Sequence, residues 1–303
     1  MRRFSTRERY EFLLKKVLVL GGTGLLGYRL GQVLAPRFDV SLTTRRAAMP
    51  RQAITSNPEV SWLYGFVDFG FQALYDFIFS LQPAVVINCI VAKGLPTNDE
   101  QALAALMANS ILPHQLSMIC SELEIRMIHI STDGVFSGAK GDYCESDMPD
   151  AKDFYGKSKA IGEICGAKCL NIRTSIIGRQ LVAQDGLVEW LLKQDGKSIS
   201  GFESSIFSGL TTESLSRLIA SLIENDLAMS GTYHVGAAAI SKYELLKLLI
   251  ESFGLDIDLK REFGPECNRS LNSDLFYLHT GLAKPNWAEM VARLALEPGL
   301  QDA

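Results

Sequence analysis

The sequence lacks the patterns that would place it in a membrane, outside the cell or on a nucleic acid. No stretch reaches the ~18 consecutive apolar residues that a bilayer-spanning helix needs. The basic residues 1–16 contain no apolar segment of the kind found in a signal peptide. The net charge of −4 and the absence of a dense basic run further along the chain argue against nucleic-acid binding. We therefore expect a soluble cytoplasmic protein with no membrane or nucleic-acid partner.

Disulfide and metal-binding patterns are missing as well. The six cysteines form no C-x-x-C pair, and no His or Cys completes a recognisable zinc spacing. Cys165 and Cys169 are close enough along the chain to touch one metal ion, but nothing supplies the remaining ligands. We expect reduced thiols, as in other cytoplasmic proteins, and no metal site.

Short apolar runs alternate with helical patterns through the first half of the 303 residues. The runs predict strands at 17–20, 40–43, 60–64, 84–88, 126–130 and 170–173, and the periodic segments predict helices at 25–34, 71–80, 100–121 and 154–165. This alternation predicts an α/β fold, a Rossmann-type doubly wound parallel sheet that binds ligands at the carboxyl ends of its strands. Later helical patterns at 187–193, 213–224, 242–253 and 285–296 predict a smaller, mostly helical second domain.

The first predicted strand runs into a glycine turn and then a helix. Gly21 allows the sharp turn, Gly24 lets the backbone approach a pyrophosphate, and Gly27 permits close packing of helix on strand. The start of the helix offers free N–H groups and a positive dipole end to phosphates. Because the trio follows a strand near the start of a βα series, it predicts a dinucleotide site. Its residues are Gly21, Thr23, Gly24, Leu25, Leu26 and Gly27.

The end of the second predicted strand favours NADP(H) over NAD(H). An NAD enzyme usually has Asp or Glu here for the ribose 2′-hydroxyl, whereas this chain has Thr44, Arg45 and Arg46. Guanidinium groups bind a 2′-phosphate, which a carboxylate would repel. We assign Asp68 to the adenine edge, although it would equally cap the next helix. Asn88, at the end of the fourth strand, is assigned to the same cofactor site.

Tyr155 and Lys159 lie four residues apart on a predicted helix and therefore on one face. An ammonium beside a phenol stabilises the phenolate, so we expect Lys159 to lower the pKa of Tyr155. Tyr155 would then exchange a proton with a carbonyl oxygen, and Lys159 would also bind the nicotinamide ribose. Thr132, at the end of the preceding strand, would polarise the same carbonyl. His129, inside that strand, is expected to be a core residue, and Asn109 either binds a backbone carbonyl or a water, or simply packs.

These motifs resemble the dTDP-4-dehydrorhamnose reductase family of extended short-chain dehydrogenases over roughly residues 16–297. The resemblance is carried by the glycine turn, by Ser131-Thr-Asp-Gly-Val-Phe136, by Tyr155-Gly-Lys-Ser-Lys159 with Gly162-Glu163, and by Arg269-Ser-Leu-Asn-Ser273. It implies NADPH-dependent reduction of the C4 ketone of a deoxysugar nucleotide, with catalytic Thr132, Tyr155 and Lys159. Substrate contacts are expected from Thr132, Asp133, Arg269, Asn272 and Ser273.

The sequence departs from the family pattern at two positions expected to line the sugar pocket. Gly134 stands where Tyr is usual, and Ile176 follows Arg173-Thr-Ser175 where an aromatic residue is usual. Ser270 replaces the usual Pro in the late motif. A roomier pocket would suit a sugar other than the rhamnose precursor.

Two other functions stay open at this point. Another sugar-nucleotide enzyme, such as an epimerase or dehydrogenase, is less favoured, since a dehydratase needs Asp-Glu after the Thr and epimerases hold NAD. A non-catalytic NADP-binding regulatory protein would resemble the regulatory subunit of methionine adenosyltransferase. The implied organisation is an N-terminal arm at 1–15, an NADP-binding domain at 16–176 that a strand within 231–236 rejoins, and a substrate-binding domain at 177–303. A homodimer is compatible with the sequence.

Overall fold

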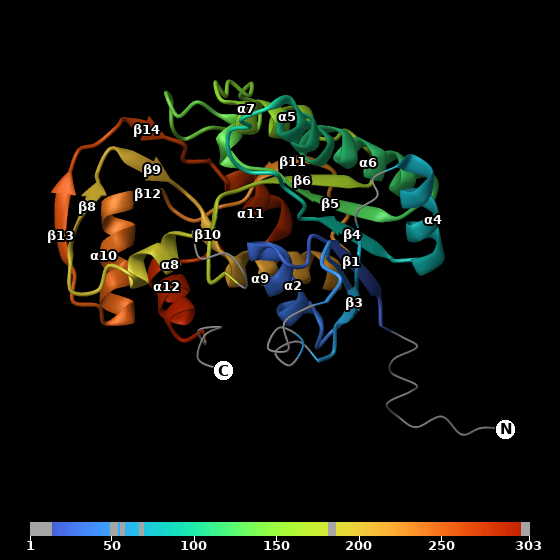
Figure 1. Cartoon of the computed structure of the whole chain (residues 1–303), viewed down its shortest axis with the longest axis horizontal. Helices are drawn as coiled ribbons and strands as arrows, with labels where there is room; N and C mark the ends of the chain where they lie inside the picture. The colour runs from blue at the N-terminus through green and yellow to red at the C-terminus, as the bar shows by residue number, and fades with distance from the viewer. Residues whose placement is uncertain (1–13, 49–53, 55–57, 67–69, 181–185, 298–303) are drawn as a thin grey trace.

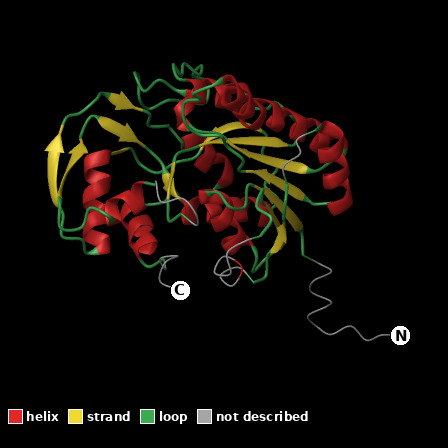
Figure 2. Cartoon of the chain, viewed as in Figure 1, coloured by secondary structure: helices red, strands yellow, loops and turns green. Residues whose placement is uncertain are grey.

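A seven-stranded parallel sheet forms the centre of the protein (Figures 1 and 2). The computed structural model describes residues 14–48, 54, 58–66, 70–180 and 186–297. The strand order is β11-β6-β5-β4-β1-β2-β3. In chain order the strands are β1 (Lys16–Leu20), β2 (Asp39–Thr43), β3 (Ser61–Leu63), β4 (Val85–Asn88), β5 (Arg126–Ile130), β6 (Cys169–Arg173) and β11 (Gly231–His234). The doubly wound sheet predicted from the sequence is confirmed, including the late strand that returns to its edge.

Helices cover both faces of this sheet because its strands are apolar on both sides. Along β1, Val17 and Val19 face one core while Leu18 and Leu20 face the other. The first core is closed by α2 (Leu25–Leu34) and α9 (Thr212–Glu224). The second is closed by α4 (Phe71–Leu81) and α6 (Leu112–Glu122), with α5 (Asp99–Leu106) and α7 (Phe154–Ile161) on the same side of the sheet in Figure 1.

The helix predicted at 100–121 is interrupted by a π-helical stretch, Met107–Ile111. Such widened turns occur frequently at functional sites, and here the stretch contains Asn109. The combined segment Asp99–Glu122 is long and apolar enough to cross a membrane by length and composition alone. Its apolar side is used in the core instead, since Leu112, Leu116 and Ile119 are fully buried against the sheet.

The rest of the chain forms a smaller layer beside the carboxyl ends of the strands. Helices α8 (Leu187–Leu192), α10 (Lys242–Phe253) and α12 (Trp287–Ala295) fall where helical patterns were predicted. A further helix, α11 (Asp274–Thr280), was missed. So were three small sheets, which pair β7 (Ile176–Ile177) with β10 (Leu210–Thr211), β9 (Ser205–Phe207) with β12 (Ile240–Ser241) and β14 (Cys267–Asn268), and β8 (Ser198–Phe202) with β13 (Asp258–Glu262).

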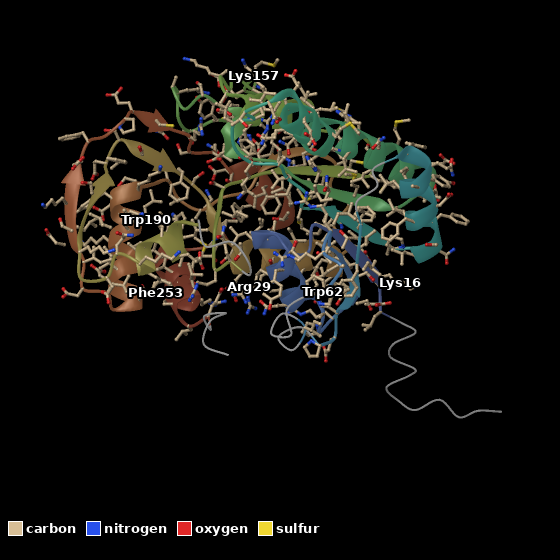
Figure 3. All side chains as sticks on the ribbon, viewed as in Figure 1. Lys16, Arg29, Trp62, Lys157, Trp190 and Phe253 are labelled. Atoms are coloured by element: carbon tan, nitrogen blue, oxygen red, sulfur yellow. The ribbon has the colours of Figure 1, made fainter. Side chains whose placement is uncertain are left out.

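One ion pair joins the beginning and the end of the described chain. Arg29 on α2, labelled in Figure 3, pairs with Glu297, which follows α12. Both side chains are largely buried. The ion pair thereby links the end of α12 to α2, the helix that follows the glycine turn.

Candidate active site

The glycine turn connects β1 to α2 in the conformation that its sequence predicts. Gly21 has a φ of +87°, in the left-handed region that favours glycine, and its carbonyl accepts a hydrogen bond from the Gly24 N–H at 3.0 Å. A Cβ atom on Gly27 would lie 2.3 Å from the Gly21 carbonyl oxygen. No other residue fits at that position. The turn leaves an open cradle at the start of α2, of the kind that receives a pyrophosphate.

A small pocket of about 310 Å³ adjoins this turn and is lined by Thr23, Thr44, Arg45 and Arg46. The Thr44 hydroxyl accepts a hydrogen bond from the Arg46 N–H at 3.1 Å, which shapes the turn after β2. Two guanidinium groups and two hydroxyls suit a phosphate, and no carboxylate lines the described wall. Asp68 lies outside the described residues.

A larger pocket of about 650 Å³ brings the predicted catalytic residues to the glycine turn. Thr132, Tyr155 and Lys159 line it together with Thr23, Gly24, Leu25, Leu26 and Arg45. Ile176, expected from the sequence to line the sugar pocket, does line it. The remaining lining comes from residues that the sequence reasoning did not assign to a site: Cys89, Val91, Lys93, Ile130, Ser131, Thr174, Ser175 and Gln180. Most of these residues directly follow β4, β5 and β6, so the position of the carboxyl strand ends was the signal that could have found them.

Tyr155 keeps its proton more firmly than we expected from the sequence. Burial raises the pKa of Tyr155, and a hydrogen bond with Thr132 opposes that rise. Lys159 is not among the largest influences on that pKa, and its lowering of the pKa of Tyr155 stays a prediction. The pKa rises because the phenol leaves water for a largely closed site. A phenol of this kind is a proton donor at neutral pH.

Lys159 is almost completely buried, with 1% of its surface exposed. Its Nζ atom donates to the Ile130 carbonyl oxygen at 2.8 Å and lies 3.3 Å from His129 Nε2. Burial lowers the pKa of Lys159 to about 8, against a smaller opposing effect of Glu163. The lysine is therefore held in one place at the base of the pocket.

Hydrogen bonds of Asn109 connect the loop after β4 to helix α7. The sequence left open whether this side chain binds a backbone carbonyl, binds a water or simply packs. Its Oδ1 accepts from the Ala92 N–H at 2.9 Å, and its Nδ2 donates to the Ala92 carbonyl at 2.9 Å and to Ser158 Oγ at 3.0 Å. The side chain is fully buried. Its role here is to bind the backbone.

Asn88 stands apart from the other predicted cofactor residues. Its side chain is fully buried between β1 and β5, with Oδ1 accepting from the Ile90 N–H and Nδ2 near His129 Nδ1. It is not among the residues that line the two pockets described above. A direct contact with the cofactor stays a prediction.

Asp133 and Arg269 interact electrostatically close to Tyr155, one of the residues that line the pocket. Burial raises the pKa of Asp133 to about 6, and the guanidinium of Arg269 is the largest opposing influence. Arg269 also lies 3.7 Å from Asp153, which begins α7. Asn272 and Ser273 are not brought to this pocket. Asn272 Oδ1 accepts from the Asp274 N–H at the start of α11, and Ser273 is buried.

The two departures from the family pattern both lie beside the catalytic groups. A Cβ on Gly134 would lie 3.2 Å from Thr132 Oγ1 and 3.4 Å from Tyr155 Cε1, so a side chain at this position would crowd both groups. Ile176 lines the pocket and is half-buried. The pocket wall therefore carries an aliphatic group at position 176, and glycine at position 134 avoids crowding Thr132 and Tyr155.

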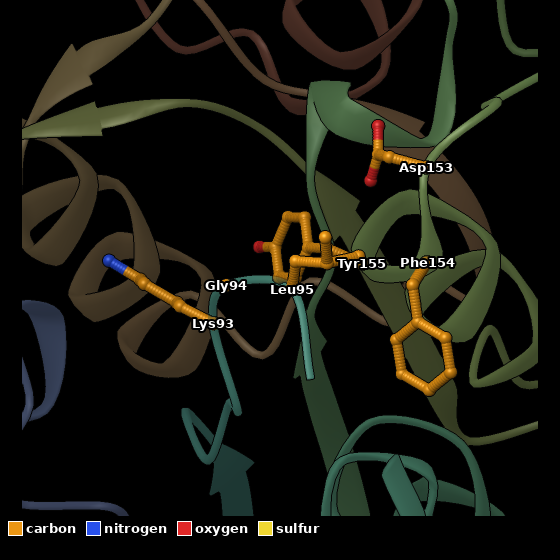
Figure 4. A pocket seen from close by; sticks show the side chains of 6 residues that line it. All are labelled: Lys93, Gly94, Leu95, Asp153, Phe154 and Tyr155. Atoms are coloured by element: carbon orange, nitrogen blue, oxygen red, sulfur yellow. The ribbon is translucent and has the colours of Figure 1, made fainter. Parts of the chain in front are cut away.

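A second opening, of about 390 Å³, leads to the other side of Tyr155 (Figure 4). Lys93 and the Tyr155 hydroxyl lie toward the same side in this view, whereas Asp153 and Phe154 lie on the far side of the ring. Lys93 lines both this opening and the main pocket. It is an exposed cation that sequence reasoning did not assign, and it is available to an anionic ligand.

A buried ion pair lies beside Ser131, between the end of β5 and Thr132. Glu163 accepts two hydrogen bonds from Arg173, at 2.8 and 2.7 Å, and one from the Ser131 hydroxyl at 2.7 Å. Arg173 also donates to His234 at 3.2 Å. This network links β5, β6, β11 and the end of α7. Within the described ranges, no group of three or more His, Cys, Asp or Glu side chains could hold a metal ion.

The pocket at the carboxyl ends of this doubly wound parallel sheet combines the glycine turn with Thr132, Tyr155 and Lys159. This combination places the protein among the extended short-chain dehydrogenases/reductases. The particular group follows from comparison with protein families. Residues 15–294 match the RmlD substrate binding domain, and the chain belongs to that family.

The proteins that this chain is similar to have names that indicate different functions. The spore coat polysaccharide biosynthesis protein SpsK of Bacillus subtilis is 26% identical over 90% of this chain and 94% of its own length. The methionine adenosyltransferase 2 subunit beta of Rattus norvegicus is 28% identical over 49% of this chain and 42% of its own length. The crystal structure of dTDP-4-dehydrorhamnose reductase from Bacillus anthracis, in complex with NADP, superposes with a TM-score of 0.76 at 21% identity, over 93% of this chain and 98% of that one.

Proposed function

We propose that this protein reduces the C4 ketone of a deoxysugar nucleotide with NADPH and that Tyr155 gives the proton. One observation carries the proposal: Tyr155, Thr132 and Lys159 line the same pocket as the glycine turn. The family match and the reductase relatives support it. The nucleotide sugar is the substrate partner, while a cytoplasmic location and a homodimer stay predictions from the sequence.

The described residues fit NADP(H). The cradle of Gly21, Gly24 and Gly27 would receive the pyrophosphate, and Arg45 and Arg46 would pair with the 2′-phosphate. The Bacillus anthracis relative was crystallised with NADP. Bound NADPH would supply a hydride to the carbonyl carbon in the main pocket.

Tyr155 supplies the proton that the reduction requires in addition to the hydride. Its raised pKa keeps the phenol protonated at neutral pH, so it has a proton to give. The Thr132 hydroxyl would share the carbonyl oxygen and polarise it. As hydride adds to the carbon, the proton passes to the oxygen, the C=O group becomes CH–OH, and the phenolate then takes a proton from solvent.

The substrate charge would be met by Arg269 and Lys93. Arg269 already influences Asp133 and Tyr155 across the pocket, and Lys93 is exposed at its rim. Both cations lie close to Tyr155. A nucleotide diphosphate would lie between them, with the sugar directed at Tyr155.

Oxidation of NADPH in the presence of a panel of 4-keto sugar nucleotides tests the proposal. We expect turnover with at least one member and a CH–OH product at C4. The rival function is a regulatory NADP-binding subunit, which the match to methionine adenosyltransferase 2 subunit beta favours. Tight NADPH binding without turnover on any panel member would support that rival and reject the reductase.

The cofactor preference gives a separate prediction. Replacing both Arg45 and Arg46 with alanine removes two cations from the 310 Å³ pocket. Because charge-assisted hydrogen bonds contribute about 1.5–3 kcal/mol each, we expect NADPH binding to weaken by at least about tenfold while NADH binding changes little. Fluorescence titration with both cofactors measures the ratio. Arg37→Ala, which alters an exposed ion pair with Glu224, is the control. An unchanged ratio in the double variant would mean that other residues read the 2′-phosphate.

A further inference from the structure

The opening on the other side of Tyr155 shares part of its wall with the main pocket but has a different content. Tyr155 and Lys93 line both spaces. Among the described residues, Thr132, Lys159 and the glycine turn line the main pocket and not the second opening. A ligand whose carbonyl oxygen reaches the Tyr155 hydroxyl can therefore extend into this opening without meeting another catalytic group there. The opening is a place for binding rather than for reaction.

Apolar side chains form the middle of the second opening. Leu95, on the loop after β4, and Phe154, at the start of α7, line it together with the Tyr155 ring (Figure 4). Leu95 is 77% exposed, so most of its side chain contacts no other part of the protein. A ligand that covered this surface would remove it from water, which is favourable.

The loop that carries Leu95 is held at both ends. Asn109 bonds both the N–H and the carbonyl of Ala92. Further along the chain, Gln101 Oε1 accepts from the N–H and from the hydroxyl of Thr97, at 3.0 and 2.9 Å. Because only four residues separate these two anchors, their positions restrict where Leu95 stands relative to the opening.

Opposite charges stand at the two ends of the opening. Lys93 supplies an ammonium group with three donors, and Asp153 supplies a carboxylate that only accepts. Figure 4 shows them on opposite sides of the Tyr155 ring. Asp153 Oδ1 accepts from the Gly156 N–H at 2.8 Å, but the side chain is half exposed and has further lone pairs. The opening thus offers a donor, an acceptor and an apolar surface between them.

One kind of sugar substituent combines the matching properties. An acylamino group has an N–H donor for Asp153, a carbonyl acceptor for Lys93, and an apolar methyl or longer chain that would cover Leu95 and Phe154. A hydroxyl in its place would leave the apolar surface uncovered. A carboxylate or phosphate would face the like charge of Asp153.

Resting on the proposed function, we propose that the substrate is an acylamino sugar nucleotide and that Leu95 is a specificity-determining residue for it. The ketone lies at Tyr155 in the main pocket, and the acylamino group lies in the second opening. C1 of the sugar carries the diphosphate and C4 carries the ketone, which leaves C2 or C3 for the acylamino group. Lys93 lines both spaces and has donors for both the diphosphate and the acyl carbonyl.

Calorimetric titration of the full chain with saturating NADPH tests the proposal without turnover. The probes are UDP-sugars and dTDP-sugars with a C4 hydroxyl, in matched pairs that carry either an acetamido group or a hydroxyl at C2 or at C3. We expect the acetamido member of at least one pair to bind at least about fourfold more tightly, the scale of one buried methyl or methylene group. No preference for the acetamido member in any pair, absence of binding included, would overturn the proposal.

Variants of Leu95 show whether this side chain carries the preference. Leu95→Asn removes the apolar surface at an exposed position, and we expect it to lose most of the preference, whereas Leu95→Ile should keep it. Leu103→Asn, at an exposed position of α5 outside the opening, is the control and should leave the ratio of affinities unchanged. A ratio in Leu95→Asn equal to that of the unaltered protein would reject the role of Leu95.

Free UDP and dTDP test for a rival occupant of the opening, the base of the nucleotide. If the acylamino group lies there, Leu95→Asn leaves the affinity for the free nucleotides unchanged. A loss of affinity for UDP or dTDP as large as the loss for the acetamido sugars would put the base in the opening and overturn the proposal.

The titrations and the turnover assay can fail separately. If the acetamido preference depends on Leu95 but no 4-keto sugar nucleotide is reduced, the proposed function fails while the inference about the acylamino group stands. If turnover is found and the matched pairs show no acetamido preference, the inference alone fails.

Discussion

Tyr155→Phe is expected to lower kcat by at least ~10²-fold while leaving the fold and NADPH affinity intact, since general acid catalysis contributes on that scale. Phenylalanine preserves the half-buried ring beside Thr132 and removes only the proton donor. Hydride addition would then build an alkoxide with no proton to neutralise it. Steady-state turnover, together with NADPH fluorescence titration, measures both parts of the expectation.

A matched tyrosine separates this effect from a general loss of hydroxyls. Tyr75 on α4 donates to Glu122 at 3.1 Å, outside the residues that line the pocket. Tyr75→Phe should retain turnover close to that of the unaltered protein. If Tyr155→Phe did so too, Tyr155 would not be the acid.

The sheet and its cofactor turn could be predicted because their signals are local. Each strand of the first half is a short apolar run, and Gly21, Gly24 and Gly27 meet backbone requirements that lie within a few residues of them. Helix α7 was predicted to reach 165 but ends at Ile161. There a Cβ on Gly162 would lie 1.9 Å from the Asn109 carbonyl oxygen, a contact with a segment some fifty residues earlier in the chain that no local pattern reports.

The small sheets were missed because their strands find partners far along the sequence. Asp258–Glu262 is a polar run with no apolar alternation, and it becomes a strand only by pairing in parallel with Ser198–Phe202. Only part of the late motif lies close to Tyr155, for a related reason. Asn272 and Ser273 immediately precede α11, whereas Arg269 acts electrostatically on Asp133 and Tyr155. A sequence motif identifies a group of residues, whereas the three-dimensional packing decides which of them face the ligand.

The protonation of the site was also beyond local reasoning. Spacing correctly put Tyr155 and Lys159 in one pocket, and it suggested that the lysine is a cation that acidifies the phenol. Burial is the largest cause of the lowered pKa of Lys159, and Glu163 opposes it. That burial arises only once the lysine packs against β5, where its Nζ atom donates to the Ile130 carbonyl.

Arg173→Met is expected to lower the free energy of unfolding, because it leaves the Glu163 carboxylate buried without its cation. The side chains of this pair are 5% and 10% exposed, and breaking such a pair costs about 3–5 kcal/mol. Arg173 also lies over the Phe136 ring, 5.1 Å from its centre, and donates to His234. Urea unfolding of the cofactor-free protein measures the free energy of unfolding.

Two further variants show whether the stability lost in Arg173→Met comes from the unpaired carboxylate of Glu163. Arg37→Met breaks the exposed pair with Glu224 and should cost less than about 1 kcal/mol, as surface pairs do. Combining Arg173→Met with Glu163→Met removes the stranded charge, so the double variant should be more stable than Arg173→Met alone. Because Glu163 also accepts from Ser131, the residue before Thr132, the double variant should still lose activity through a looser strand end. A double variant no more stable than the single one would show that the cost of Arg173→Met lies in lost packing on Phe136 rather than in the unpaired carboxylate.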